Sequence, residues 1–312
     1  MDDDVGPPGP RGPQWQEAEV SRLVQSRIAG QVGEIRRLDP LVRYDAPDAV
    51  HAMRVALRRL SAALATFRPT LERTVTEPMR EELRWLARTL GAARDAEVQR
   101  ARLDDSLGDD HAAVRRRVDH RLSEQYAQAH AVALVAMDSD RYRALLDSLD
   151  RLATEPPWTS TAGEPARVVV PERLERDWTR LDRRMDLALR TDDPVHRATL
   201  LHDARRAAKR LRYALEPVVA AYDGGDGTQA RRAQRTLMGI KDLQSVLGDL
   251  QDTVVTRQLL RELPSELGLD PDGSFLLGRL HGREESAAQH AMRSVDEAWQ
   301  AARRSRPRRW LV

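Results

Sequence analysis

Hydrophobic residues recur every three to four positions along most of the chain, the spacing that places them on one side of an α-helix. This periodicity predicts four helices in the first half, over 14–38, 47–67, 73–106 and 109–152, and four in the second, over 172–189, 194–222, 228–263 and 271–303. Pro47, Pro194 and Pro271 stand where the first turn of a helix needs no amide donor, which supports those three starts. The predicted fold class is all-α, with two four-helix bundles.

Two stretches without helical periodicity divide the chain. Residues 1–13 are rich in proline and glycine and indicate a leader, and residues 154–171 carry several prolines and indicate a linker. We therefore expect a first half over 14–153, a second half over 172–303, and a basic tail over 304–312.

The two predicted halves share two motifs. Each half has one histidine followed at i+3 and i+7 by cations and then by Arg-Leu, and each has a later Leu-Gly-x-x-x-Asp. The first motif comprises His51, Arg54, Arg58 and Leu60 in one half and His202, Arg205, Lys209 and Leu211 in the other, and the second motif ends at Asp95 and at Asp252. Such self-similarity predicts an internal repeat of one unit.

Both histidine helices are amphipathic in the same way. Apolar side chains recur at steps of three and four and predict a buried stripe. The stripe consists of Val50, Met53, Leu57, Leu60, Leu64 and Phe67 in the first copy and of Leu201, Ala204, Ala208, Leu211, Leu215 and Val218 in the second. The cations follow one position later and flank the stripe, with Arg212 extending the second row. Like charges at this spacing destabilise a helix slightly, so an anionic partner is expected beside them.

The second motif adds residues to the same predicted surface. Arg84, Gly91 and Arg94 share one row of their helix, and Lys241 and Gly248 share the matching row in the other half. A glycine inside a helix costs about 1 kcal/mol relative to alanine, so we expect another backbone or a ligand to approach closely there. Asp95 and Asp252 lie beside these rows, where a carboxylate can hold an arginine in one rotamer or simply face solvent.

Composition narrows the possible chemistry. The chain has 51 lysine and arginine residues and 49 acidic ones, so its net charge does not indicate a partner. Only a separation of positive and negative charges onto different faces of the protein would indicate one. It has no cysteine, which excludes disulfides and thiolate metal sites. The histidines form no metal-binding spacing, and no phosphate-binding loop or carboxylate cluster suited to magnesium is evident. We expect no metal, no cofactor, no catalytic residues and no membrane span, in a soluble cytoplasmic protein.

If the cation rows line a groove, its ligand is a polyanion with closely spaced charges. Inorganic polyphosphate, a nucleic acid backbone and an acidic protein all satisfy that requirement. Tyr213 is the only aromatic residue near the rows, and base recognition usually uses several stacking platforms. The pattern thus favours phosphate chains without bases and gives no reason to expect a specific nucleic acid.

At these residues the chain resembles the CHAD family, named for a histidine in an α-helical domain, from about residue 14 to residue 303. The resemblance implies two four-helix bundles related by a pseudo-twofold, with a basic cavity between them that binds inorganic polyphosphate. It assigns binding to His51, Arg54, Arg58, Arg94, His202, Arg205, Lys209 and Arg212, whereas Arg84 and Lys241 are added from helix geometry. The two halves differ in charge at two matched positions. The first half has Ser61 where the second has Arg212, and the second has Gln251 where the first has Arg94.

The leading hypothesis is therefore a binding module without chemistry of its own, which sequesters polyphosphate or localises the protein to polyphosphate granules. The first alternative is a metal-dependent polyphosphate phosphatase or phosphotransferase that uses the same groove. The second is a helical adaptor for acidic partners. The sequence leaves the oligomeric state open.

Overall fold

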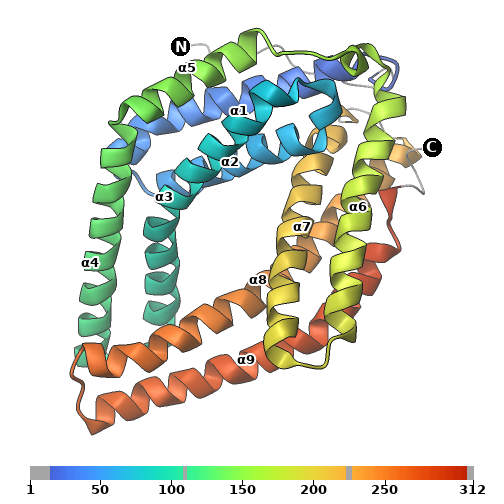
Figure 1. Cartoon of the computed structure of the whole chain (residues 1–312). Helices are drawn as coiled ribbons and strands as arrows, with labels where there is room; N and C mark the ends of the chain where they lie inside the picture. Colours follow the sequence, from blue (N-terminus) through green and yellow to red (C-terminus); the bar gives the residue numbers. More distant parts are fainter. Residues whose placement is uncertain (1–14, 108–110, 223–226, 308–312) are drawn as a thin grey trace.

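The computed structural model describes residues 15–107, 111–222 and 227–307, and this part of the chain forms nine α-helices and no strand (Figure 1). The all-α prediction is confirmed. In chain order the helices are α1 (Val20–Arg43), α2 (Ala49–Thr66), α3 (Arg73–Leu107), α4 (Ala112–Met137), α5 (Asp140–Thr154), α6 (Ala166–Arg190), α7 (Pro194–Ala221), α8 (Thr228–Glu266) and α9 (Pro271–Arg303). Two short 3₁₀ helices, Arg68–Thr70 and Ser160–Gly163, complete the regular structure of these residues.

The single helix predicted over 109–152 is wrong, because the structure divides this stretch into α4 and α5. Ser139 has an extended backbone between them, and its hydroxyl accepts a hydrogen bond from the amide of Tyr142 at 3.2 Å. A serine in this position caps a helix start by supplying the acceptor that the first turn lacks. The first half therefore has five helices rather than four, and α5 turns back along α1 (Figure 1).

The boundaries of other elements also differ from the prediction. Helix α1 covers Val20–Arg43, whereas the prediction was 14–38. Helix α6 begins at Ala166, so the last residues of the predicted linker, including Pro171, are helical. Val169 and Val170 are buried there, and burial in the core outweighs the unfavourable proline. Pro47 precedes the N-cap of α2, whereas Pro194 and Pro271 do lie in the first turns of α7 and α9. The predicted leader over 1–13 and the tail beyond residue 307 lie outside the described residues.

The predicted apolar stripes of α2 and α7 form the centre of the main core. Every residue of both stripes is at most 3% exposed. Around them, α1 packs against α2 and α5 in the first half, and α6 packs against α7 in the second. Trp178 of α6 and Trp299 of α9 stack with their ring centroids 5.7 Å apart. Because α2 also contacts α7, one continuous core joins the two halves.

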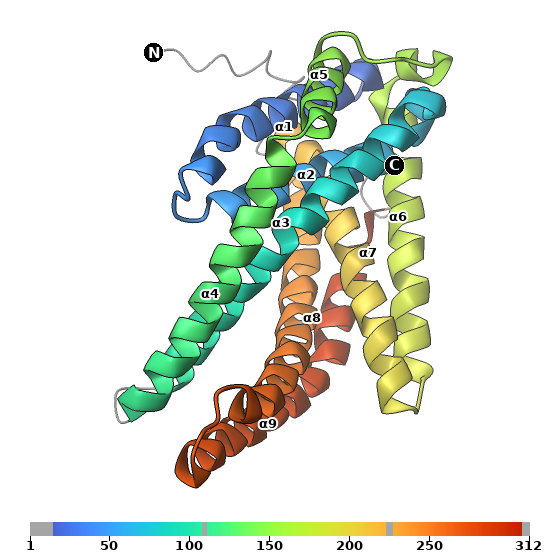
Figure 2. The same cartoon turned by 60° about the vertical axis from the view of Figure 1, so that its left-hand side comes forward.

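The helices enclose a roughly four-sided frame in the view of Figure 1. The ends of α3 and α4 extend away from the main core as one pair, and those of α8 and α9 as another (Figures 1 and 2). A second apolar cluster joins the far ends of the two pairs. It consists of Leu103, Leu107, Val118, Leu122, Leu260, Leu263, Leu276, Leu277 and Leu280. The halves thus meet twice, at α2 and α7 and again at the far ends of the long helices.

Candidate functional site

Arg54 of α2 is buried against α3, only 8% exposed. Its Nη1 donates to the carbonyl oxygen of Gly91 and to Oδ1 of Asp95, both at 3.2 Å. A side chain at position 91 would begin 3.4 Å from Nη2 of Arg54, so the glycine makes room for the guanidinium. Gly91 does have a close neighbour, but that neighbour is an arginine side chain of the protein itself rather than the second backbone or the ligand that was predicted.

The second half repeats this arrangement with small differences. A side chain at Gly248 would begin 3.3 Å from Nη2 of Arg205, and Asp252 lies 4.0 Å from the same nitrogen. Burial raises the pKa of Asp252, while Arg205 and Arg102 oppose the rise. Arg205 is half-buried and thus less enclosed than Arg54. Each half therefore holds an arginine between a helix glycine and an aspartate; the pseudo-twofold relation of the halves stays a prediction.

Cations of α2 and α7 come close together where the two halves meet. The pKa of Lys209 is lowered to about 7. The largest cause is burial, the positive charges of Arg205, Arg58 and Arg212 lower it further, and the negative charge of Asp252 raises it slightly. Burial and Arg58 in turn lower the pKa of Arg54. Within the described part of the chain, neither Arg58 nor Lys209 has a carboxylate within 4.0 Å. We call Arg54, Arg58, Arg205, Lys209 and Arg212 the central cation cluster.

The two histidines lie at the edge of this cluster in different surroundings. His51 is exposed, and burial of part of its ring, followed by the charge of Arg94, lowers its pKa. His202 is half-buried, and its Nδ1 lies 3.0 Å from Oε1 of Gln251. Since a phosphate attracts a protonated imidazole more than a neutral one, the field of the arginines weakens His51 as an anion ligand at neutral pH.

Arg94 and Arg212 also have carboxylate partners, as Arg54 and Arg205 do. Arg94 pairs with Glu97 at 2.8 Å and with Asp48 at 3.6 Å. Arg212 lies 3.5 Å from Glu216, with its guanidinium over the ring of Tyr213. Glu216 also binds Arg27 of α1 at 2.7 Å and Arg59 of α2 at 3.0 Å. This junction of three arginines on one glutamate was missed from the sequence, because its members come from three separate helices.

The two cations that were added from helix geometry are the most peripheral. Arg84 of α3 is exposed and lies 3.7 Å from Glu81, and its charge lowers the pKa of Arg80 after the larger effect of burial. Lys241 of α8 is exposed and makes no ion pair among the described residues. Arg80, four residues before Arg84 on the same side of α3, was also missed, although that spacing was visible in the sequence.

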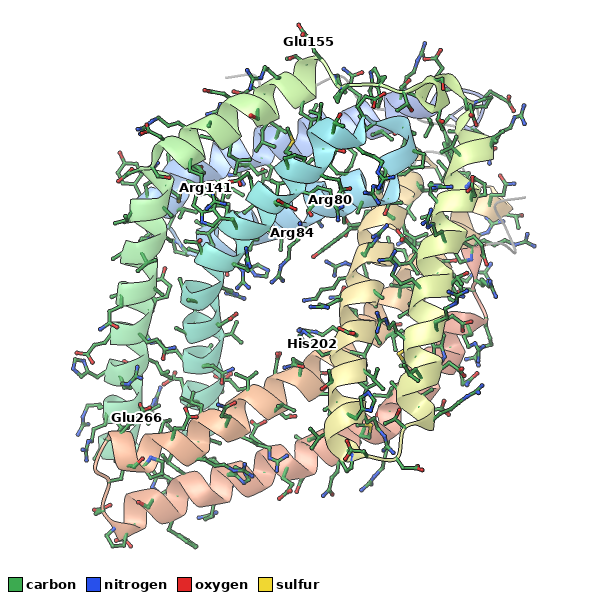
Figure 3. The ribbon with its side chains drawn as sticks, in the orientation of Figure 1. Arg80, Arg84, Arg141, Glu155, His202 and Glu266 are labelled. Atoms are coloured by element: carbon green, nitrogen blue, oxygen red, sulfur yellow. The ribbon has the colours of Figure 1, made fainter. Side chains whose placement is uncertain are left out.

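Side chains of the site face the middle of the frame. Arg84 and His202 point toward it from α3 and α7 (Figure 3). Arg205, Lys209 and Arg212 follow His202 at helical spacing and lie along the same side of α7. This placement directs positive charge from both halves toward one region.

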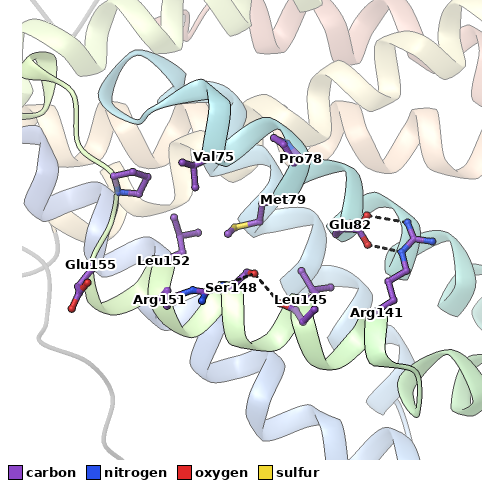
Figure 4. Close-up of a pocket in the computed structure, with 12 residues that line it drawn as sticks. Val75, Pro78, Met79, Glu82, Arg141, Leu145, Ser148, Arg151, Leu152 and Glu155 are labelled. Atoms are coloured by element: carbon purple, nitrogen blue, oxygen red, sulfur yellow. Dashed lines mark hydrogen bonds and ion pairs between the residues drawn. The ribbon is translucent and has the colours of Figure 1, made fainter.

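A pocket of about 480 Å³ lies elsewhere, between α3 and α5 (Figure 4). Its walls include Val75, Met79 and Leu152, and the ion pair of Glu82 with Arg141 borders it at 2.6 Å. None of the predicted binding residues lines this pocket. No group of three or more histidine or acidic residues suited to a metal is present among the described residues, and no described helix is long and apolar enough to cross a membrane.

Comparisons with known proteins place the chain among similar sequences and structures. It is 32% identical to two uncharacterized proteins of Mycobacterium tuberculosis, MT2285 of strain CDC 1551 / Oshkosh and Rv2226 of strain H37Rv, over 94% of this chain. The alignment spans 56% of each relative, so the chain corresponds to about half of their length.

Two solved structures share the fold. PptA from Streptomyces chartreusis superposes with a TM-score of 0.74 at 23% identity, over 91% of this chain and 100% of the other. The CHAD domain from the plant Ricinus communis superposes with a TM-score of 0.68 at 26% identity, over 95% and 96% of the two chains. Residues 26–261 match the CHAD domain family, which includes both histidine motifs and both Leu-Gly-x-x-x-Asp motifs. The chain therefore belongs to the CHAD domain family.

Proposed function

We propose that the protein binds inorganic polyphosphate along the inner side of the frame, through the central cation cluster. The observation that carries the proposal is that Arg58 of α2 lies close enough to Lys209 of α7 for its charge to lower the pKa of that amine, where the two helices pack together. Uncompensated cations held this close are unfavourable in the free protein, and a polyanion with closely spaced charges relieves their repulsion. Polyphosphate, the ligand that the family resemblance implies, has one charge on each repeating unit.

The surroundings of the cluster favour a phosphate chain over a nucleic acid. Tyr213, the aromatic residue nearest to the cation rows, is only 5% exposed, and Arg212 covers its ring. A buried ring offers no face on which a base can stack. In this proposal the cations bind the charged phosphate groups and do not contact the edges of bases. We therefore propose no specific binding of nucleic acid.

We further propose that binding involves no chemistry and that it sequesters polyphosphate or brings the protein to polyphosphate granules. Asp95 and Asp252 are each engaged with an arginine, and in this proposal they orient the cluster.

The test compares two double variants with the same change in charge. Arg58→Gln/Lys209→Gln removes two cations of the cluster that have no carboxylate partner. Arg143→Gln/Arg190→Gln removes two exposed surface cations, whose ion pairs are with Asp140 and Asp186 of their own helices. We expect the first variant to lose about tenfold in polyphosphate affinity for each cation removed, since a charge-assisted contact contributes roughly 1.5–3 kcal/mol, and the control to bind as the wild type does.

Two further measurements separate the alternatives. Duplex DNA in excess is expected to displace little polyphosphate, and full displacement would contradict the preferred ligand. Release of phosphate from polyphosphate in the presence of a divalent metal, if lost in the cluster variant, would support an enzyme instead. If both double variants bind polyphosphate with equal affinity, the central cation cluster is not part of the binding site.

A further inference from the structure

Lys209 is one of only two lysines in a chain with 51 basic residues, and the other is Lys241. Lys209 lies on α7 with Arg205 one turn before it and Arg212 one turn after it, and Arg58 faces it from α2. Asp252 of α8 is the acidic group that acts on it. Lys241 lies exposed on α8 and makes no ion pair among the described residues. The two amines of one molecule thus have opposite surroundings.

The surroundings of Lys209 disfavour its protonated form. Burial and three arginines lower the pKa of its amine to about 7, so close to half of the amine is neutral at neutral pH. An ordinary lysine with a pKa near 10.4 is almost entirely protonated there. Because only the neutral amine carries a free electron pair, Lys209 is a nucleophile under conditions in which other lysines are not.

We propose that Lys209 is a modification site that is acylated by small acyl phosphates, with the neighbouring arginines holding the phosphate of the donor. The guanidinium groups of Arg58, Arg205 and Arg212 match phosphate oxygens in charge and geometry. They lie on both sides of the amine along α7 and across from it on α2, so a donor phosphate bound to them brings its acyl group next to the nitrogen.

The reaction is a simple acyl transfer. The electron pair of the Lys209 nitrogen attacks the carbonyl carbon of the acyl phosphate, and a C–N bond forms. The bond between that carbon and the bridging oxygen breaks, and its electron pair leaves with inorganic phosphate. The nitrogen loses one proton, which the departing phosphate accepts. The product is a neutral amide, and no oxidant or reductant is needed.

The consequence for ligand binding rests on the proposed function. Acylation converts a side chain that can carry a positive charge into a permanently neutral one at the centre of the cluster. The modified protein is therefore expected to bind polyphosphate about tenfold more weakly, since one charge-assisted contact is lost. Polyphosphate that is already bound covers the same arginines and is expected to protect Lys209.

The experiment uses the full chain and acetyl phosphate at neutral pH, with acetylation of Lys209 and Lys241 measured separately by peptide mass spectrometry. Lys241 serves as the reference amine in the same molecule. We expect Lys209 to react at least about tenfold faster, because of its larger neutral fraction. Equal rates at the two lysines would overturn the proposal.

Two variants and a second donor test the role of the arginines. Arg205→Gln and the more exposed Arg58→Gln are each expected to slow acetylation of Lys209 and leave Lys241 unchanged, and circular dichroism verifies their fold. An uncharged N-hydroxysuccinimide ester has no phosphate for the arginines to hold, so its reaction rate reports on the amine alone. We therefore expect the arginine variants to slow the reaction of Lys209 with acetyl phosphate more than its reaction with the ester. Equal loss with both donors would overturn the docking of the phosphate.

Added polyphosphate separates this proposal from the proposed function. Protection of Lys209 from acetyl phosphate supports both. Fast acetylation that depends on the arginines but is not inhibited by polyphosphate supports the modification site and contradicts polyphosphate as the ligand.

Discussion

Replacing Lys209 with methionine is expected to stabilise the free protein, because the substitution removes a cation that the fold disfavours. Methionine keeps most of the length and volume of the lysine stem without its charge. The half-buried position and the adjacent arginines penalise the protonated amine only in the folded state. The unfolded chain has no such penalty, so the difference appears directly in the free energy of unfolding.

The size and sign of the effect follow from the pKa of Lys209. A fall from 10.5 to about 7 corresponds to an unfavourable free energy of roughly 4–5 kcal/mol, at ~1.4 kcal/mol per pH unit. Partial access of solvent reduces this figure to ~2 kcal/mol. Between about pH 7 and pH 10.5 the unfolded state binds more protons at this residue, so this contribution to stability rises with pH in that window and is constant below it.

Urea denaturation, followed by circular dichroism, measures the effect at two pH values. We expect Lys209→Met to be more stable than the wild type by ~2 kcal/mol near pH 7, with a smaller difference near pH 10. Saturating polyphosphate is expected to stabilise the wild type more than the variant, because only the wild type regains a favourable cation. A variant that is no more stable than the wild type near pH 7, or a gain independent of pH, would refute the reasoning.

Three further predictions concern the same site. Gly248→Ala adds a carbon 3.3 Å from Nη2 of Arg205; we expect calorimetry to show weaker polyphosphate binding with unchanged or slightly higher thermal stability, since alanine favours the helix by about 1 kcal/mol. Polyphosphate affinity is expected to fall as pH rises above about 7 because the Lys209 amine loses its proton, and titration calorimetry should show a weaker dependence in Lys209→Arg; parallel pH profiles would contradict this. Arg54→Glu places a carboxylate beside Asp95 in a buried position and is expected to lower the free energy of unfolding by about 3–5 kcal/mol in urea denaturation, so an unchanged midpoint would contradict a structural role for Arg54.

The helical fold was predictable because each long helix carries a periodic apolar stripe. The stripes of α2 and α7 were identified residue by residue, since a spacing of three and four leaves one solution for the buried side. The break at Ser139 was not predicted, because the apolar pattern continues through it and a serine has no obligate effect on a helix. The start of α6 was placed too late, since its first turns contain Pro171 and are held by burial in the core.

The candidate site was predictable as a set of residues but not as a set of contacts. Spacing alone identified Arg54 and Arg58 as equal members of one row, whereas the structure buries Arg54 against Gly91 and leaves Arg58 exposed. The low pKa of Lys209 depends on Arg58 of the other half, and no local pattern reveals a partner so distant in the chain. Glu216, which binds arginines of α1 and α2, was missed for the same reason.

The central claim is that cations from both halves bind one phosphate chain, and the salt dependence of affinity tests it most directly. Each cation that displaces a condensed counterion contributes about 0.7 to the slope of log affinity against log salt, by analogy with single-stranded nucleic acids. Arg58→Gln/Lys209→Gln, which removes one cation from each half, is expected to lower the magnitude of this slope by about 1.4 relative to the wild type and to Arg143→Gln/Arg190→Gln. The same slope in all three proteins would contradict the account.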